Sequence, residues 1–255
     1  MHVIMNSNPL FRDTHIPKHG ELEVIIRSES SIEENLALNE QFAREAARTG
    51  RKTLRLWWGG HPTAVLGCGD KPEEALDLGE CHKRGIGYVK RVTGGGTVLQ
   101  TSGVFNYTYT APDSGCLDTA KTFEQGAELV IRALSQFNIS AEKQGISDVA
   151  VGNLKISGNA QARKWKAILL HGTLLVDVDT ELMNAVLRHP RKEPDYRRRR
   201  SHSDFIVTLA DLGIRASNAE VEAAFTWAAQ IPTQNGVRNL GRASCQNAFT
   251  HPSGE

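Results

Sequence analysis

Three consecutive glycines, Gly94-Gly95-Gly96, constrain the fold of this chain more than any other feature of its sequence. They lie between two strand-like segments, 87–91 and 104–110, so the pattern predicts strand, glycine loop, strand. Glycine has no Cβ atom and adopts backbone conformations closed to other residues, which lets a ligand approach the main-chain N–H groups closely. The loop is therefore a candidate binding site as well as a turn.

Arg91 and Thr93 add chemistry to this loop. A fixed guanidinium and a hydroxyl donor together suit a phosphate or an acyl carbonyl. The sequence matches neither the P-loop pattern GxxxxGKS/T nor the dinucleotide fingerprint GxGxxG. A glycine-rich turn without a ligand explains the loop equally well at this point.

Hydrophobic periodicity predicts strands with interspersed helices. Strands are predicted at 22–26, 53–58, 64–66, 87–91, 104–110, 148–156, 168–170 and 173–178, and helices at about 32–47, 71–84, 122–137, 181–187 and 219–229. Turn residues predict a hairpin at 59–62, another at Gly152-Asn153, and a His171-Gly172-Thr173 turn. Because hairpins are mixed with helices, we expect an α+β fold, a mixed β-sheet with flanking helices, and not a doubly wound sheet.

The length of 255 residues allows one large domain or two small ones, and no linker divides the chain. We expect residues 1–20 to be a polar N-terminal tail and 21–255 to be a single domain, polar from about residue 242 and without a C-terminal accessory domain. The N-terminal segment lacks the apolar stretch of a secretory signal, and no run of eighteen apolar residues predicts a membrane-spanning helix.

Charge and cysteine usage exclude several classes of protein. Thirty basic and twenty-nine acidic residues leave a formal net charge of +1, so no overall charge attracts nucleic acid or an anionic membrane. The four cysteines, Cys68, Cys81, Cys116 and Cys245, are far apart and form no CxxC pair, which argues against a zinc knuckle and a disulfide framework. We expect reduced thiols, a cytoplasmic protein, and neither nucleic acid nor membrane as a partner.

Lys155 and His171 are ambiguous when each is considered alone. Lys155 follows a strand-like apolar segment, and a lysine on an alternating strand ordinarily points to solvent. A buried histidine with backbone partners explains the apolar surroundings of His171 nearly as well as a contact to substrate does.

Six segments taken in order are more specific. They are Glu34 to Glu40, Arg91 to Val98, Asn106-Tyr107, Asp148, Lys155 to Gln161 and His171 to Leu175. Together they resemble the lipoate-protein ligase A branch of the biotin/lipoate ligase and octanoyltransferase superfamily, over roughly residues 22–212. The signatures RxxGGGxV and KxSGxAQ indicate the lipoate side of that superfamily, and the GRGR-type loop of biotin ligases is absent.

This resemblance implies the biotin/lipoate ligase catalytic-domain fold and an ATP-dependent ligase. Members turn a carboxylic acid and ATP into an acyl-adenylate and pass the acyl group to a lysine of a lipoyl-domain protein. Lys155 corresponds to the catalytic cation, Arg91 to a phosphate contact, and Gly94 to Gly96 to the lining of the acyl tunnel. The implied substrate- and nucleotide-binding residues are Arg91, Thr93, Gly94, Gly95, Gly96, Asn106, Gly158, Ala160, His171 and Thr173, with Mg²⁺ at Asp148.

Two features depart from the family pattern. Members often have a histidine shortly after the glycine loop, where this sequence has Gln100. Many also have a C-terminal accessory domain, whereas about forty residues follow Leu212 here, so a separate accessory subunit is a further expected partner. The resemblance leaves lipoate and octanoate open as the acid, because one apolar tunnel accepts both.

Two alternative functions use the same fold. An ATP-independent octanoyl or lipoyl transferase carries the acyl group as a cysteine thioester and needs a reactive thiolate near the lysine. No cysteine lies between Cys116 and Cys245, where transferases of this superfamily keep their nucleophile, and Cys68 is explained more simply as a small packed thiol. A non-catalytic module that only binds lipoyl domains would have no need of Arg91 and Lys155 beside the glycines, so the ligase ranks first.

The segment 191–200 has six basic residues in ten. A solvated loop is the default interpretation, because like charges repel one another and stay hydrated. The alternative is a patch that steers an acidic lipoyl domain, or the phosphates of ATP, to the site. Nucleic acid is a poor alternative, since Tyr196 is the only aromatic residue of the segment.

Overall fold

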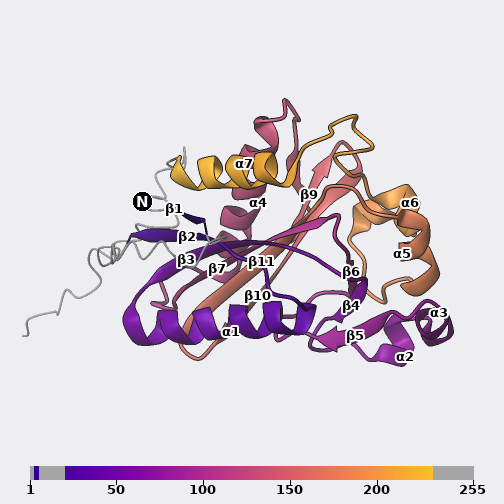
Figure 1. Ribbon diagram of the computed structural model, residues 1–255, viewed down its shortest axis with the longest axis horizontal. Coiled ribbons are helices and arrows are strands. Elements are labelled where there is room, and N and C mark those ends of the chain that lie inside the picture. Colours follow the sequence, from indigo (N-terminus) through magenta and orange to yellow (C-terminus); the bar gives the residue numbers. More distant parts are fainter. Residues whose placement is uncertain (1–2, 6–20, 232–255) are drawn as a thin grey trace, which may run out of the picture.

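The computed structural model describes residues 3–5 and 21–231, and the strands among them form two sheets (Figure 1). The eight-stranded sheet has the order β1-β2-β3-β7-β11-β10-β9-β8, and the three-stranded sheet has the order β5-β4-β6. The strands are β1 (Val3–Met5), β2 (Leu22–Ile26), β3 (Lys52–Trp58), β4 (Thr63–Leu66), β5 (Gly87–Lys90), β6 (Val98–Gln100), β7 (Val104–Pro112), β8 (Glu142–Gln144), β9 (Asp148–Val151), β10 (Leu154–Lys164) and β11 (Ala167–Leu175). In the larger sheet β1–β2 and β2–β3 pair in parallel and the other pairs are antiparallel.

Helices cover both faces of the larger sheet. They are α1 (Ile32–Thr49), α2 (Pro72–Ala75), α3 (Leu78–Lys83), α4 (Thr119–Ser135), α5 (Thr180–Val186), α6 (His202–Phe205) and α7 (Asn218–Gln230), with a 3-10 turn η1 at Asp195–Arg197. Helix α1 packs over β3, β7 and β11 on one face, and α4 packs with α7 on the other (Figure 1). This mixed sheet with flanking helices confirms the predicted α+β class.

Local sequence sets the ends of α1. The Ser31 hydroxyl accepts a hydrogen bond from the N–H of Glu34, and the Glu34 carboxylate accepts one from the N–H of Ser31, which is a capping box. Gly50 ends the helix in the left-handed conformation, with φ of 78°. The predicted start at Ile32 is confirmed, and the helix runs to Thr49, slightly beyond the predicted end.

The two faces of the larger sheet differ in polarity, because successive side chains of a strand point to opposite faces. The face under α4 and α7 holds the main hydrophobic core, where Tyr107 packs against Phe225 of α7. The face under α1 carries polar groups in register: Arg55 of β3 and His171 of β11 both align with Thr108 of β7. The candidate site residues of β11 therefore lie on the polar face.

Arg55 fastens α1 to this polar face. Its guanidinium is fully buried and donates to Asn39 Oδ1 at 2.7 Å, to the Asn35 carbonyl at 3.0 Å and to the Arg27 carbonyl at 3.0 Å. Burial lowers the pKa of Arg55 to about 9. A buried charge needs such partners, so the two asparagines of α1 have a structural function.

Two predicted elements near the glycine loop are wrong. The hairpin at 59–62 does not form, because β3 belongs to the larger sheet and β4 to the smaller one. The single helix predicted at 71–84 is two short helices, α2 and α3. The chain is extended between them at Leu76, which is buried and pairs with Leu187 as an isolated bridge.

The predicted His171-Gly172-Thr173 turn is also wrong, since all three residues lie inside β11 and pair with β7. A Cβ atom on Gly172 would lie 2.2 Å from Asn159 Oδ1 and 2.5 Å from Tyr107 Cε1. Glycine stands here because neighbouring side chains approach the backbone closely, and not because the chain turns.

Other predictions about organisation have mixed outcomes. The hairpin at Gly152-Asn153 is confirmed, with β9 and β10 on either side and φ of 57° at Gly152. Within the predicted tail 1–20, Val3–Met5 form β1 beside β2, while the polar stretch from residue 242 lies outside the described residues. Among the described residues, no helix combines the length and the apolar character needed to cross a bilayer.

Candidate functional site

The glycine loop, residues 91–97, connects β5 to β6 in the smaller sheet. It contacts the larger sheet through Thr93 and His171. Gly95 has φ of 85°, a left-handed conformation that favours glycine. A Cβ atom on Gly67 would lie 1.9 Å from the Gly95 carbonyl oxygen, so the loop and the turn at Gly67 are in direct contact. The N–H of Cys68 also donates to the Thr93 carbonyl at 2.9 Å.

Arg91 holds the loop in shape from inside. Its side chain is buried and donates from Nη2 to the carbonyls of Gly94 at 2.7 Å and Gly96 at 2.8 Å, and from Nη1 to the Val65 carbonyl at 3.0 Å. Burial lowers the pKa of Arg91 to about 10. The observed partners of this guanidinium are protein groups, so its contact with phosphate stays a prediction, and its observed function is to order the loop.

Thr93 joins the loop to β11. Arg91 Nε donates to the Thr93 hydroxyl at 2.9 Å, and the same hydroxyl lies 2.7 Å from His171 Nε2. Burial, reinforced by the Arg91 charge, lowers the pKa of His171 to about 3, so the imidazole is neutral near pH 7. The Thr93 hydroxyl oxygen accepts from Arg91 and shares a second hydrogen bond with Nε2, whose direction depends on the His171 tautomer.

Small residues on β10 lie beneath the loop. Ala160 pairs with His171 across the sheet, and its Cβ lies 3.8 Å from where a Cβ on Gly95 would be. Gly158 is two residues before Ala160 and therefore shares its face of the strand. Gly95, Ala160 and Gly158 thus form a floor without bulky side chains.

Lys155 lies at one end of this floor. A Cβ atom on Gly158 would lie 2.8 Å from both Cε and Nζ of Lys155, so the lysine side chain crosses over the glycine. Its Nζ is 2.8 Å from Asp148 Oδ1, and the two side chains are 28% and 10% exposed. Asp148 Oδ2 accepts a hydrogen bond from the Tyr196 hydroxyl at 2.9 Å. Lys155 is therefore a paired but accessible cation, and the expectation that it points freely to solvent is not met.

Asn106 and Thr173 lie further along the polar face. They align across β7 and β11, so the structure brings them together. The buried amides of Asn106 and Gln100 exchange two hydrogen bonds, at 2.8 and 3.0 Å. Gln100, the residue that departs from the family pattern, thus completes a closed pair with Asn106 and does not lie open to a ligand.

Magnesium coordination by Asp148 stays a prediction. Within residues 3–5 and 21–231, no group of three or more His, Cys, Asp or Glu side chains could hold a metal ion. Mg²⁺ commonly uses one or two carboxylates together with substrate phosphates, so a single aspartate is a suitable donor. Both Asp148 oxygens have protein partners, so an ion at this carboxylate would have to compete with Lys155 or Tyr196.

The described cysteines occupy three different environments. Cys68 is an exposed free thiol beside the glycine loop, so its explanation as a small packed thiol is wrong, and Cys81 is a buried free thiol on α3. Burial raises the pKa of Cys81. Cys116 is disulfide-bonded, so the expectation of reduced thiols throughout is wrong for this residue. Cys245 lies outside the described residues.

Tyr196 is the residue of this site that sequence reasoning missed. It was noted only as the aromatic member of the basic segment 191–200, and no local pattern links it to Asp148. The solvated-loop interpretation of that segment is also incomplete. Arg197 is buried with its guanidinium 4.8 Å from the Phe205 ring centre, and Arg200 donates to the Asn153 carbonyl at 2.8 Å, whereas Arg198 and Arg199 are exposed.

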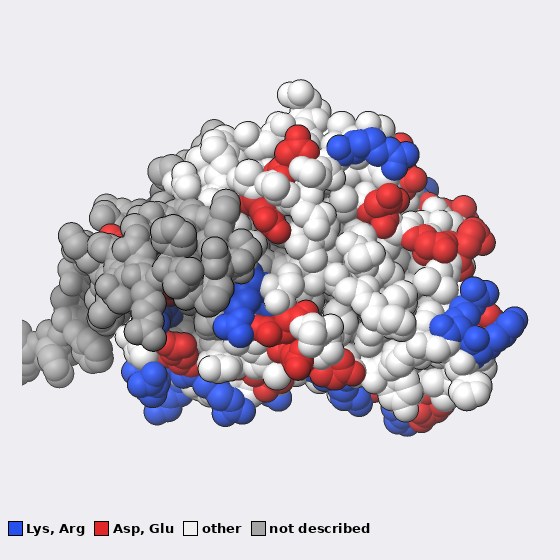
Figure 2. All heavy atoms as spheres, in the orientation of Figure 1, with Lys and Arg blue, Asp and Glu red and all other residues white. Residues whose placement is uncertain are grey.

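The surface charge agrees with the neutral composition. Figure 2 shows basic and acidic residues interspersed on one face, some along its edge and some within it, with an uncharged area between them. No charge of a single sign covers the part of this face that is drawn in colour.

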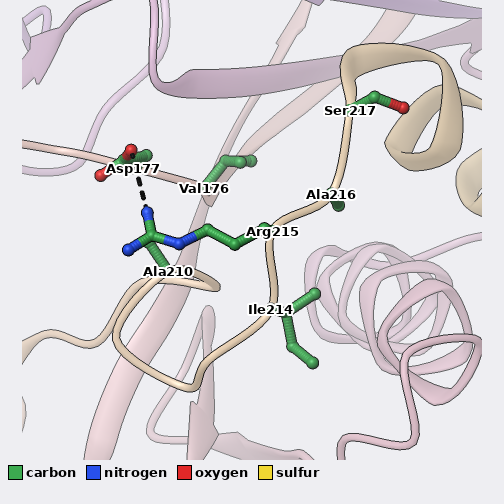
Figure 3. Close-up of a pocket in the computed structure, with 7 residues that line it drawn as sticks. All are labelled: Val176, Asp177, Ala210, Ile214, Arg215, Ala216 and Ser217. Carbon is green, nitrogen blue, oxygen red and sulfur yellow. Dashed lines mark ion pairs between the residues drawn. The ribbon is translucent and has the colours of Figure 1, made fainter.

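A cavity of about 290 Å³ lies away from these residues, between the end of β11 and the segment before α7 (Figure 3). Arg215 Nη1 lies 3.8 Å from Asp177 Oδ2 at its edge, and both side chains are largely exposed. Its lining residues are Val176, Asp177, Ala210, Ile214, Arg215, Ala216 and Ser217. None of the predicted site residues contributes to it.

Comparison with known proteins identifies relatives of the chain. The family model described as lipoyl protein ligase A/B catalytic domain matches residues 31–229. Lipoate–protein ligase 1 of Staphylococcus aureus is 28% identical over 159 residues, which are 62% of this chain and 47% of that protein. The chain thus spans about half the length of that curated relative.

A transferase and a solved ligase structure are similar as well. Octanoyltransferase LipM of Carboxydothermus hydrogenoformans is 29% identical, covering 75% of this chain and 79% of that protein. The crystal structure of a lipoate-protein ligase A bound with ATP aligns with a TM-score of 0.70 and 25% identity, over 82% of this chain and 83% of that chain.

Proposed function

The chain belongs to the family of lipoyl protein ligase A/B catalytic domains, and from this premise we propose that it is an ATP-dependent lipoate-protein ligase. In this proposal it activates lipoate or octanoate as acyl-AMP and transfers the acyl group to a lysine of a lipoyl-domain acceptor protein. The likeness to a ligase structure bound with ATP supports the choice of co-substrate.

The observation that carries this proposal is the position of Lys155. Its ammonium lies 2.8 Å from Asp148, and its side chain is 28% exposed and crosses over Gly158 at the end of the small-residue floor. The other end of the floor lies under the glycine loop that Arg91 and Thr93 hold against the sheet. A ligand on this floor meets backbone groups along its length and one cation at its end.

Lys155 would act on the first step. A carboxylate oxygen of the acid attacks the α-phosphorus of ATP, an O–P bond forms, and pyrophosphate leaves with the electron pair of the broken P–O bond. The ammonium would hold the two anionic reactants together and stabilise the negative charge that develops between them. In the second step the acceptor amine attacks the acyl carbonyl, AMP leaves, and the amine loses a proton. Mg²⁺ bound with ATP would add positive charge at the phosphates.

A second candidate is an ATP-independent octanoyltransferase. Two observations support it: similarity to LipM extends over most of that protein, and Cys68 is exposed beside the glycine loop. A thioester on Cys68 would then replace the adenylate. We rank the ligase first because no contact in the described part of the chain links the Cys68 thiol to Lys155.

One assay separates the two functions. The purified protein is mixed with an apo lipoyl domain and either lipoate with ATP or an octanoyl-carrier donor without ATP, and the mass of the acceptor is measured. Each acid is also assayed for pyrophosphate release without the acceptor, so that activation and transfer are observed separately. Modification that requires ATP supports the ligase. Modification from the carrier donor without ATP, lost in Cys68→Ser, would establish the transferase instead.

The acceptor and any accessory subunit belong to the same proposal. If pyrophosphate is released but the acceptor stays unmodified, a separate accessory subunit is required for transfer. If the acceptor is modified by this chain alone, the accessory subunit is not required. A non-catalytic binding module would give neither reaction and would still bind the lipoyl domain.

A further inference from the structure

One short segment reaches Lys155 from two sides. The Lys155 carbonyl accepts a hydrogen bond from the N–H of Val207 at 2.9 Å, and Lys155 pairs with Ile206 as an isolated bridge. The ammonium group is held at the other end of the residue, because Asp148 bridges Lys155 Nζ and the Tyr196 hydroxyl at 2.8 and 2.9 Å. Tyr196 and Val207 both belong to the segment 195–207, so that segment contacts Lys155 directly through its backbone and indirectly through Asp148.

The Tyr196 ring is fixed where it lies. It packs on the buried ring of Phe205, with ring centres 5.0 Å apart and planes tilted by 51°. The carbonyl of Tyr196 accepts a hydrogen bond from Arg200 Nη2 at 2.9 Å. The Tyr196 hydroxyl is the donor in its contact with Asp148, because a carboxylate oxygen accepts. The packing of the ring on Phe205 therefore holds the Tyr196 hydroxyl beside Asp148.

We propose that Tyr196 is a positioning residue for Lys155: its hydroxyl fixes one oxygen of Asp148 so that the other oxygen aims the ammonium across Gly158. A carboxylate held at only one oxygen can rotate about its terminal torsion, which has broad minima. Held at both oxygens, Asp148 presents Lys155 in one place before substrate arrives, and such preorganisation removes a reorganisation cost from the reaction. The inference rests on the proposed function only in taking Lys155 as the catalytic cation.

Tyr196→Phe tests this inference because it removes the hydroxyl and keeps the ring on Phe205. We expect kcat for pyrophosphate release to fall about tenfold, the effect of losing a hydrogen bond to a charged group. The KM for ATP should change by less than about twofold, because the lost interaction acts on the reacting geometry and not on ground-state binding. The temperature of unfolding should fall by only a few degrees, because the hydrogen bond is lost but the ring keeps its packing on Phe205. Tyr88→Phe, at an exposed position on β5, is the matched control.

A second measurement does not depend on catalysis. Labelling of Lys155 by an amine-reactive reagent at one fixed pH is followed by mass spectrometry, with the exposed Lys90 as internal reference. In Tyr196→Phe the label should enter Lys155 about fivefold faster, because the ammonium is held less firmly. Faster labelling of Lys155 in a protein that forms no adenylate would support the positioning role and overturn the proposed function.

Two results would overturn the inference itself. The first is an unchanged rate of labelling at Lys155, whatever happens to kcat. The second is an active enzyme whose kcat is unaffected by Tyr196→Phe, even if labelling is faster. A third outcome is a lower kcat together with a large fall in the unfolding temperature and an unchanged rate of Lys155 labelling. This outcome would show that Tyr196 is merely part of the packing around Phe205.

Discussion

The hydroxyl oxygen of Thr93 lies 2.7 Å from Nε2 of His171, and Arg91 Nε donates to the same oxygen at 2.9 Å. Through this one hydroxyl, the glycine loop of the smaller sheet is joined to β11 of the larger sheet. A loop of three glycines is flexible by itself, so its shape must come from such contacts. The contacts of Thr93 and Arg91 therefore order the glycine loop.

Thr93→Val should destabilise the protein and weaken the site. Valine has nearly the same shape but leaves Arg91 Nε and His171 Nε2 without their partner, which costs about 1–3 kcal/mol of unfolding free energy for groups that are buried. Chemical denaturation measures the loss. Thr110→Val is the matched control, because the Thr110 hydroxyl is buried and has no hydrogen-bond partner among the described residues, so its removal should be neutral or slightly stabilising. Equal losses in both variants would show that the Thr93 hydroxyl contributes nothing special.

His171 should make the protein less stable at mildly acidic pH. Its pKa is about 3 in the folded state, below the ordinary value of 6.5. Above pH 6.5 the imidazole is neutral in both the folded and unfolded states, so it adds no pH dependence. As the pH falls below 6.5, the unfolded state takes up a proton that the folded state excludes, and stability falls until about pH 3.

The slope of this loss is at most about 1.4 kcal/mol for each pH unit per histidine. The free energy of unfolding, measured by chemical denaturation at several pH values between 7 and 4, should therefore fall less steeply with decreasing pH in His171→Gln than in the wild type. His82→Gln, at an exposed position on α3, should leave the slope unchanged. The same slope in His171→Gln and in the wild type would contradict a His171 that stays neutral in the folded state.

Gly158→Ala should reduce activity far more than stability. The new Cβ would lie 2.8 Å from Cε and Nζ of Lys155, and a flexible side chain can move away from it cheaply. Displacing the ammonium by about 1 Å is enough to lower the rate roughly a hundredfold. Pyrophosphate release and thermal unfolding are measured together. Gly87→Ala is the control, since nothing lies within 4 Å of a Cβ at that position on β5. An active Gly158→Ala enzyme would mean that Lys155 does not act from its observed place.

Substitutions in the basic segment should differ in their effect on stability, according to whether the arginine is buried or exposed. Arg197→Gln removes a buried guanidinium that stacks on Phe205 and lies 3.6 Å from Glu193, so we expect a loss of about 1–3 kcal/mol in unfolding free energy. Arg198→Gln and Arg199→Gln change exposed side chains and should alter stability by less than about 0.5 kcal/mol.

Arg198 and Arg199 also carry the steering hypothesis. If they attract an acidic lipoyl domain, their double neutralisation should slow association several-fold at low ionic strength and have little effect at high ionic strength. Stopped-flow association with the acceptor domain, at two salt concentrations, measures this. An association rate without salt dependence in the wild type would leave these arginines as ordinary solvated groups.

Local signals in the sequence predict the parts of the fold that depend on neighbouring residues. The start of helix α1 at Ile32 and the hairpin at Gly152 were predicted, because the interactions that set them, such as the capping box at Ser31 and Glu34, span only a few residues. The wrong turn at Gly172 has the opposite origin. That glycine is required by Asn159 and Tyr107, which contact it from two other strands, and such contacts leave no local pattern.

The site divides in the same way. The motifs around Arg91 and Lys155 identify the loop and the lysine strand, and the order of these motifs indicates the family. They do not show that the Arg91 guanidinium donates its hydrogen bonds to the loop, because only the folded chain brings the Gly94 and Gly96 carbonyls to it. Tyr196 is separated from Asp148 by 48 residues, so its hydrogen bond could not be predicted without an alignment of related sequences or a structure.

The most direct test of the central claim is pyrophosphate release from ATP in the presence of lipoate, with wild-type protein and with Lys155→Ala. The exposed Lys143 on β8 supplies the control variant Lys143→Ala. We predict release by the wild type and by Lys143→Ala, and a loss of at least about a hundredfold in Lys155→Ala, because a preorganised cation at the developing charge has an effect of that size. An unchanged rate in Lys155→Ala would contradict the account.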